Sequence, residues 1–105
     1  MTAQIVNWKG VSGKSYQYTV HALETNWNDV PGNYIFAKLD GNRWTAIYIG
    51  ETESFAKRLP NHEKWPCVRR YGATAIHAHV NNSGTQGRRN EEQDLIALHD
   101  PPCNE

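Results

Sequence analysis

Several side chains of the types used in phosphoryl chemistry are spread over the second two thirds of the chain. In order they are Gly32-Asn33-Tyr34, Tyr48-Ile49-Gly50, Arg58, His62, Glu92 and Asn104. Hydrolysis of a phosphodiester needs an activated water, neutralised phosphate charge and help for the departing oxygen. Phenol, guanidinium, imidazole and carboxylate groups supply these functions together, whereas packing rarely needs that mixture. The set therefore indicates metal-assisted attack on a phosphodiester.

Glu92 is the candidate metal ligand. A carboxylate can hold one hard divalent cation, Mg²⁺ or Mn²⁺, with water completing the coordination shell. A single Glu on a helix is more often simply solvated, and Glu91 and Asp94 are competitors on the same segment. The Glu-x-x-Leu-Ile frame favours Glu92, because Leu95 and Ile96 then anchor the helix face beside it.

Arg58 and His62 are candidates for contact with the phosphate and for proton transfer. The planar fork of Arg58 suits a non-bridging phosphate oxygen. His62 follows four residues later and can relay a proton or hydrogen-bond a tyrosine hydroxyl. Pro60 disfavours a continuous helix between them, so their relative placement stays open. An ordinary surface arginine and histidine are the alternatives.

Tyr34 and Tyr48 are placed on the two arms of a predicted hairpin. Strands over 33–39 and 44–49 flank the turn Asp40-Gly41-Asn42-Arg43, so the two phenols can face one side. A phenol has an unperturbed pKa of about 10 and is a poor base unless a cation favours the phenolate. Aromatic filling of a half-buried sheet is the alternative for both residues.

The remaining elements complete an α+β pattern. Residues 15–21, after the turn at 10–13, and residues 73–80 are rich in β-branched and aromatic types and predict strands. A short helix capped by Thr52 or Ser54, then helices over about 61–71 and 86–99, fill the intervals. The chain therefore predicts a small, mostly antiparallel sheet flanked by helices.

Length and charge bound the possible partners. The 105 residues suffice for one domain over residues 1–105, and the net charge is zero. Residues 56–89 carry seven basic groups and one acidic group, whereas residues 90–105 carry five acidic groups and no basic one. The basic stretch predicts a phosphate-tracking surface, although an ordinary mixed surface fits the charges equally well. The candidate nucleic-acid-binding residues are Lys57, Lys64, Arg69, Arg70, Arg88 and Arg89.

Nothing in the sequence predicts a membrane or secretory protein. No apolar run approaches the roughly 20 residues that span a bilayer, and the start at Met1 lacks a basic and apolar signal segment. We therefore expect a cytoplasmic protein with Cys67 and Cys103 as free thiols. Close-spaced ligand pairs such as Cys-x-x-Cys are absent, which argues against zinc.

The ordered motifs resemble the GIY-YIG nuclease domain family, in particular a small stand-alone bacterial or phage-type member. The resemblance covers residues 31–104 and implies a three-stranded antiparallel core with flanking helices, to which residues 1–30 add an N-terminal strand. Asn33 departs from the family, which usually has an apolar residue there. If Asn33 faces the core, its amide must find partners or it costs about 1–3 kcal/mol.

The resemblance also implies an activity. It predicts a divalent-metal-dependent endonuclease acting on DNA, with Tyr34, Tyr48, Arg58, His62 and Glu92 as catalytic residues. One tyrosine would help to deprotonate the attacking water while the other orients, and which does which stays open. Site geometry would be supported by Gly32, Gly50 and Asn104, the last by tying the chain end back near the site. The alternative is a catalytically silent nuclease-like domain that binds nucleic acid or a protein partner. A homodimer or a targeting partner is compatible with the small size.

Overall fold

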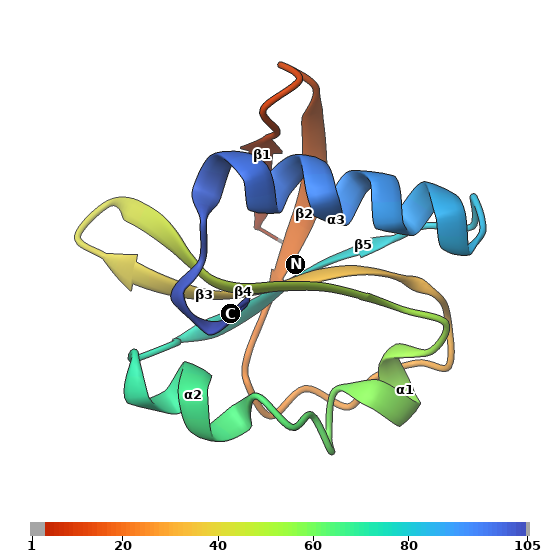
Figure 1. Ribbon diagram of the computed structural model, residues 1–105. Helices are drawn as coiled ribbons and strands as arrows, with labels where there is room; N and C mark the ends of the chain where they lie inside the picture. Colours follow the sequence, from red (N-terminus) through yellow and green to blue (C-terminus); the bar gives the residue numbers. More distant parts are fainter. Residues whose placement is uncertain (1–3, 105) are drawn as a thin grey trace.

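The computed structural model describes residues 4–104 and shows an α+β fold in which a curled antiparallel sheet lies between α3 on one side and α1 and α2 on the other (Figure 1). The elements are β1 (Ile5–Lys9), β2 (Ser15–His21), β3 (Gly32–Asp40), β4 (Arg43–Thr52), α1 (Phe55–Arg58), α2 (Trp65–Arg70), β5 (Ala75–Val80), α3 (Thr85–His99) and the 3-10 turn η1 (Pro102–Asn104). The predicted α+β class is confirmed.

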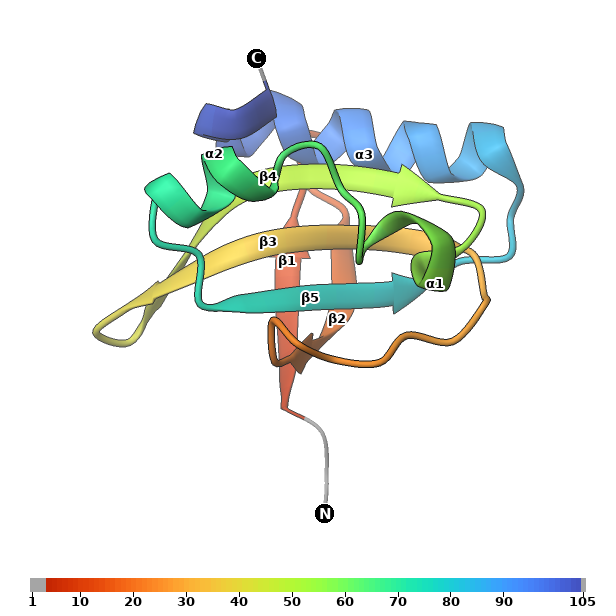
Figure 2. The ribbon, with the colours of Figure 1, turned by 90° about the horizontal axis from the view of Figure 1, so that it is seen from below.

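The sheet has five strands in the order β1-β2-β5-β3-β4. The prediction of a three-stranded core with one added N-terminal strand is therefore wrong in strand number, because β1 also joins the sheet. β1 is short, leaves Asn7 and Lys9 exposed and fully buries only Trp8, so its local pattern is weak. Figure 2 shows the β1–β2 hairpin running across the direction of β3, β4 and β5.

β3 is an inner strand whose residues alternate between two hydrophobic clusters, as the two-residue period of a strand requires. Tyr34 and Phe36 pack in the cluster that includes Phe55 of α1 and Val68 of α2. Ile35 and Ala37 pack in the other, whose members on further elements include Trp8, Tyr18 and Leu95. Both faces of β3 are thus covered, and the strand is a rigid base for its tyrosine.

Of the two helices on the Tyr34 face, α1 is short as predicted, and α2 is shorter than predicted. Ser54 caps α1 by accepting the Lys57 N–H on its Oγ at 3.2 Å. The helix predicted over 61–71 begins only at Trp65, because Pro66 is favoured in a first helical turn rather than inside a helix. Within residues 4–104, none of the helices combines the length and apolar character needed to cross a membrane.

The N-terminal hairpin is tied to α3 by Asp94. Its carboxylate accepts hydrogen bonds from the Ser12 backbone N–H at 2.8 Å, the Ser12 hydroxyl at 2.6 Å and the Tyr16 hydroxyl at 2.8 Å. A Cβ on Gly10 would lie 2.1 Å from Asp94 Oδ2, so only glycine lets the hairpin approach so closely. Asp94 therefore has a structural role.

Cys67 and Cys103 form a disulfide that joins α2 to η1. The prediction of free thiols is therefore wrong, because packing of the chain end against α2 brings together two residues 36 positions apart. The bond lies next to Asn104 and fixes the end of the chain against the sheet.

Cys67→Ser is expected to lower the free energy of unfolding by roughly 3–4 kcal/mol, because the bond closes a loop of 36 residues in the unfolded chain. Urea unfolding with and without a reductant measures the effect. The double variant Cys67→Ser, Cys103→Ser is the control and should not respond to reductant. An equally insensitive wild type would contradict the disulfide.

Candidate active site

Tyr34 and His62 form a buried hydrogen-bonded pair. Tyr34 is 1% exposed, His62 is 3% exposed, and the Tyr34 hydroxyl lies 2.7 Å from Nε2 of His62. Nδ1 of His62 accepts the backbone N–H of Lys64 at 3.0 Å, so a neutral ring carries its proton on Nε2 and donates it to Tyr34. Burial, followed by the charge of Arg58, lowers the pKa of His62 to about 4, which keeps the ring neutral at ordinary pH.

Tyr48 shares this face of the sheet but is only half-buried. In the β3–β4 register Tyr34 lies opposite Gly50, and Phe36 lies opposite Tyr48. The rings of Tyr34 and Tyr48 are stacked with centroids 6.2 Å apart, and the His62 ring meets Tyr48 edge-on at 4.9 Å. The structure thus brings the two phenols and the imidazole together.

Gly50 leaves the space in which these rings meet. A Cβ at this position would lie 2.6 Å from both Cζ and Oη of Tyr34 and 2.9 Å from Cε2 of Tyr48. Gly32 is similarly confined, since a Cβ there would lie 2.3 Å from the His79 carbonyl oxygen. Both glycines are therefore required for close approach beside β3 and β4.

Arg58 is the last residue of α1 and lies beside both phenols. Burial raises the pKa of Tyr34 and of Tyr48, and the charge of Arg58 acts in the opposite direction on each. Both terminal nitrogens of Arg58 donate to Glu63, Nη1 to Oε2 at 2.7 Å and Nη2 to Oε1 at 2.6 Å. Although Pro60 ends α1, the following loop returns His62 to the same cluster.

Glu92 lies on α3 and is half-buried. Burial raises the pKa of its carboxyl, and the charge of Glu51 raises it further. Glu92 in turn raises the pKa of Tyr48. Leu95 is fully buried on the same helix and holds it against the sheet. The charge of Glu92 thus acts on Tyr48.

The neighbouring Glu91 is engaged inside the fold. Its Oε2 accepts the Tyr18 hydroxyl at 2.6 Å and the Nδ1 proton of His79 at 2.9 Å, and its Oε1 accepts Nδ2 of Asn81 at 3.3 Å. The side chain is 6% exposed. Of the three acids on α3, Glu91 and Asp94 therefore make hydrogen bonds that hold the structure together.

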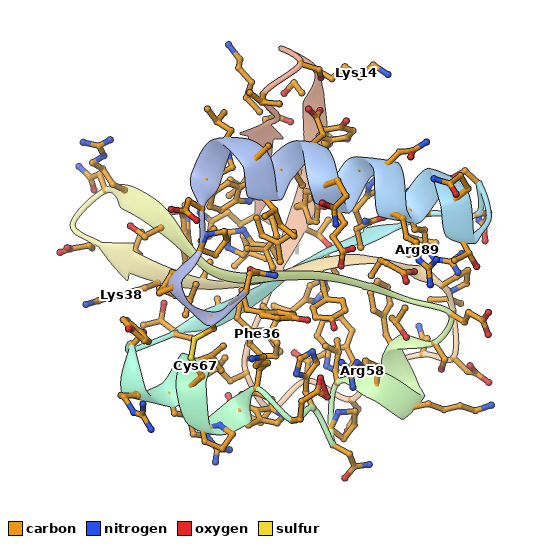
Figure 3. All side chains as sticks on the ribbon, viewed as in Figure 1. Lys14, Phe36, Lys38, Arg58, Cys67 and Arg89 are labelled. Atoms are coloured by element: carbon orange, nitrogen blue, oxygen red, sulfur yellow. A yellow bond between two sulfur atoms is a disulfide. The ribbon has the colours of Figure 1, made fainter. Side chains whose placement is uncertain are left out.

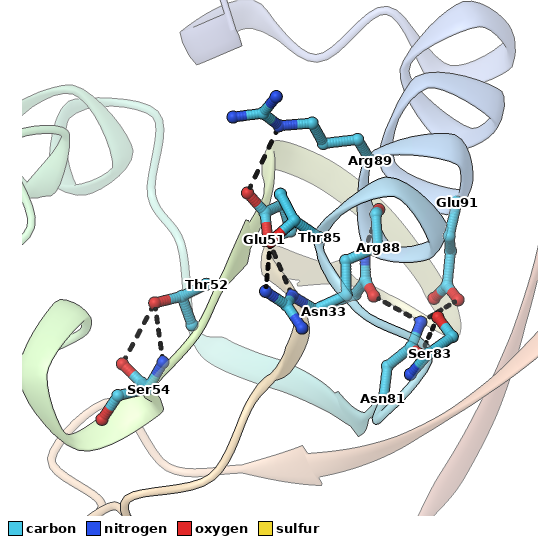
Figure 4. A network of polar contacts seen from close by, with 10 residues as sticks. All are labelled: Asn33, Glu51, Thr52, Ser54, Asn81, Ser83, Thr85, Arg88, Arg89 and Glu91. Carbon is cyan, nitrogen blue, oxygen red and sulfur yellow. Dashed lines mark hydrogen bonds and ion pairs between the residues drawn. The ribbon is translucent and has the colours of Figure 1, made fainter.

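Asn33 faces the α3 side of the sheet and is fully buried. Its Nδ2 donates to the Arg88 carbonyl at 2.8 Å, and its Oδ1 accepts Nδ2 of Asn81 at 3.0 Å (Figure 4). The amide thus has partners for both of its polar atoms, which removes the expected penalty. Arg88 precedes Glu92 by one helical turn, so the hydrogen bond from Asn33 also fixes the position of this part of α3 relative to β3.

Asn104 ties the chain end to β4 next to Tyr48. Its Oδ1 accepts the Ile49 N–H at 2.9 Å, and its Nδ2 donates to the Ile49 carbonyl at 2.8 Å. These two bonds occupy the backbone of the residue between Tyr48 and Gly50. They therefore support the position of the tyrosine strand.

Part of the predicted phosphate-binding set lines one groove of about 450 Å³ between α1 and the start of α3. Lys57, Arg58 and Arg89 line it, and Figure 3 shows Arg58 near α1 and Arg89 below α3. Arg88 also borders the groove, but its side chain is 5% exposed and its Nε donates to Glu51 at 2.9 Å. In this structure the Arg88 guanidinium is therefore paired with Glu51 inside the fold, and phosphate binding by Arg88 stays a prediction.

The other predicted basic residues lie on or beside α2. Lys64 precedes the helix, and Arg69 and Arg70 are its last exposed residues. The Arg69 guanidinium lies over the Trp65 ring, 4.9 Å from its centroid. The basic stretch of the sequence therefore divides between two regions of the surface.

Two charged neighbours of the site, Glu51 and Glu63, were not among the predicted residues. Glu51 pairs with Arg88 and lies 3.9 Å from Nε of Arg89, while Glu63 holds Arg58. The sequence did contain a signal that these two residues lie near the site, because Glu51 directly follows Gly50 and Glu63 directly follows His62.

The carboxylate of Glu92, the single protein ligand considered, fits a divalent cation that keeps most of its water ligands. Among residues 4–104, no three or more His, Cys, Asp or Glu side chains are grouped so that they could hold a metal ion. Mg²⁺ keeps several of its waters and uses one or two carboxylates, so Glu92 with water suffices. The charge of Glu51 disfavours ionised Glu92, and a bound cation relieves that repulsion.

No family model matches the sequence, and no curated protein matches it either. Among solved structures the chain is similar to the GIY-YIG N-terminal endonuclease domain of UvrC from Thermotoga maritima, a point mutant bound to its catalytic divalent cation. The two share 28% sequence identity at a TM-score of 0.58, over 75% of this chain and 87% of that one. Together with the ordered motifs and the fold that carries them, this likeness supports a GIY-YIG domain in this chain.

Proposed function

We propose that this GIY-YIG domain is a divalent-metal-dependent endonuclease that hydrolyses phosphodiester bonds in DNA. The observation that carries the proposal is the cluster of Tyr34, Tyr48, His62 and Arg58 on one face of the sheet, where the charge of Glu92 also acts on Tyr48. The similar UvrC domain is an endonuclease bound to a divalent cation, which supports both activity and metal dependence.

Each residue has a role that follows from its surroundings. Bound at Glu92, a divalent cation supplies Lewis-acid neutralisation of the phosphate charge. Arg58 binds a non-bridging phosphate oxygen through its guanidinium fork. Tyr48 takes the proton of the attacking water, because its half-buried ring is reachable from solvent whereas Tyr34 is 1% exposed.

Tyr34 and His62 position the site. Nε2–H of His62 donates to the Tyr34 hydroxyl at 2.7 Å, which turns the proton of that hydroxyl outward from the imidazole. The stacked contact between Tyr34 and Tyr48 then fixes the plane of the second ring. The pair thus holds Tyr48 in place while it accepts a proton.

The groove lined by Lys57, Arg58 and Arg89 is the proposed path of the DNA backbone. Residues 31–104 form the proposed catalytic core. The β1–β2 hairpin supports it through Asp94 and Glu91 of α3. Mg²⁺ or Mn²⁺ is the proposed metal, one ion per site.

Incubation of the purified protein with supercoiled plasmid and with branched DNA tests the proposal. We expect cleavage with Mg²⁺ or Mn²⁺ and none with EDTA. Nicked circles indicate a monomer cutting one strand, and linear products indicate two copies acting together. Metal-independent binding with no cleavage of any substrate would instead support a silent nucleic-acid-binding domain.

Gly50→Ala is expected to reduce the cleavage rate about a hundredfold, because its Cβ would displace both phenol rings. The rate is measured in single-turnover plasmid cleavage, with thermal unfolding to confirm the fold. Gly41→Asn is the control, since that turn has φ +64, which Asn tolerates, and nothing lies within 4 Å of a new Cβ. Equal rates for Gly50→Ala and the control would show that ring position does not matter.

A further inference from the structure

The Arg58–Glu63 pair occupies both terminal nitrogens of the guanidinium that the proposed function assigns to the phosphate. The two hydrogen bonds are 2.7 and 2.6 Å long and form a bidentate fork. A phosphodiester presents two oxygens to the same fork with the same geometry. The carboxylate and a phosphate therefore compete for this edge of the guanidinium.

Glu63 stands on a loop that is fixed on both sides of it. His62 is buried against Tyr34, and Trp65 donates its Nε1 proton to the Leu59 carbonyl at 2.8 Å. Between these anchors the Glu63 side chain remains 59% exposed, and that of Arg58 is 35% exposed. The loop thus places an exposed carboxylate next to the arginine. The Glu63 side chain can move away from Arg58 while the core stays packed.

We propose that Glu63 is an internal competitor for the substrate phosphate, which must displace its carboxylate from Arg58 before cleavage. The inference rests on the proposed role of Arg58. An exposed ion pair contributes little net free energy because water solvates both partners well. A phosphate that also contacts Lys57, Arg89 and the cation at Glu92 can therefore displace Glu63, whereas a single weak anion cannot.

The exchange does not depend on protonation of Glu63. The hydrogen bonds from Arg58 lower the pKa of its carboxyl to about 2, so it is ionised throughout the range in which such an enzyme works. By competing for Arg58, Glu63 weakens the binding of every phosphate ligand. Ligands with one phosphate contact are disfavoured relative to DNA, which makes several contacts at once.

The test compares Glu63→Gln with Glu53→Gln in a Glu92→Gln background, in which cleavage is too slow to disturb the binding measurement. Glu53 is exposed and lines the same groove as Arg58, so the control removes the same charge without uncovering the guanidinium. We expect Glu63→Gln to tighten binding of a labelled DNA duplex about two- to fivefold, measured by fluorescence anisotropy. Glu53→Gln should change the affinity less.

A double-mutant cycle with Arg58→Gln locates the effect. If Glu63 acts by covering Arg58, Glu63→Gln should no longer tighten binding once Arg58 is absent. In cleavage-competent protein, Glu63→Gln should lower KM and leave kcat unchanged. Thermal unfolding confirms that every variant is folded.

Three results would overturn the inference: weaker or unchanged binding by Glu63→Gln, a fall in kcat that marks Glu63 as a residue positioning Arg58, or equal tightening by Glu53→Gln. Because affinity is measured without cleavage, the outcome does not depend on activity. A wild type that cuts DNA while Glu63→Gln fails to bind more tightly would refute only this inference. A wild type that binds but never cuts would refute only the proposed function.

Discussion

Replacing Glu92 by glutamine is expected to lower the rate of DNA cleavage by about 10²- to 10³-fold, because the amide keeps the shape of the side chain but removes the charge that holds the cation. Excess Mg²⁺ or Mn²⁺ should not restore the rate, since amide oxygens bind such ions far more weakly than carboxylates. Single-turnover cleavage over a range of metal concentrations measures both effects.

Glu91→Gln is the matched control, one residue away on the same helix. Glutamine still accepts the Tyr18 hydroxyl but loses the charged partner of His79, so the free energy of unfolding should fall by about 1–3 kcal/mol. Cleavage at a temperature where the variant is folded should stay within an order of magnitude of wild type. The reverse pattern would make Glu91 the catalytic acid and Glu92 the structural one.

The parts of the fold that the sequence predicts well are set by local patterns. The hairpin of β3 and β4 follows from two runs of apolar and aromatic residues on either side of Asp40 and Gly41, and it places Tyr34 and Tyr48 on one face. Local patterns do not predict β1, because its main buried residue, Trp8, donates its hydrogen bond to His77, which lies 69 residues further along the chain. The disulfide likewise depends on packing between distant segments.

The polar residues of the site show the same division. The order and type of Arg58, His62 and Glu92 could be read from the motifs. Burial of Arg88 could not, because it depends on an ion pair with Glu51, 37 residues away in the chain. Asn33 is the clearest case, since an amide in an apolar position is acceptable only when the Arg88 carbonyl and Asn81 meet it in space.

Tyr48→Phe is expected to reduce kcat by about 10²- to 10⁴-fold, the usual contribution of a general base. Burial raises the pKa of Tyr48, and the charge of Glu92 raises it further, so the free protein holds the neutral phenol. A cation at Glu92 cancels that second contribution, and the charge of Arg58 lowers the pKa as well. Metal binding and proton removal by Tyr48 are therefore linked.

The pH dependence separates the two tyrosines. The phenolate fraction of Tyr48 grows as pH rises towards its pKa, so the wild-type rate should increase between about pH 7 and pH 9. Tyr48→Phe should lose that slope together with most of the rate. Tyr34→Phe should keep the slope at a lower rate, because it removes only the acceptor of the His62 proton and leaves the base intact. If Tyr34→Phe lost the pH dependence of the rate and Tyr48→Phe kept it, the buried phenol of Tyr34 would be the base instead.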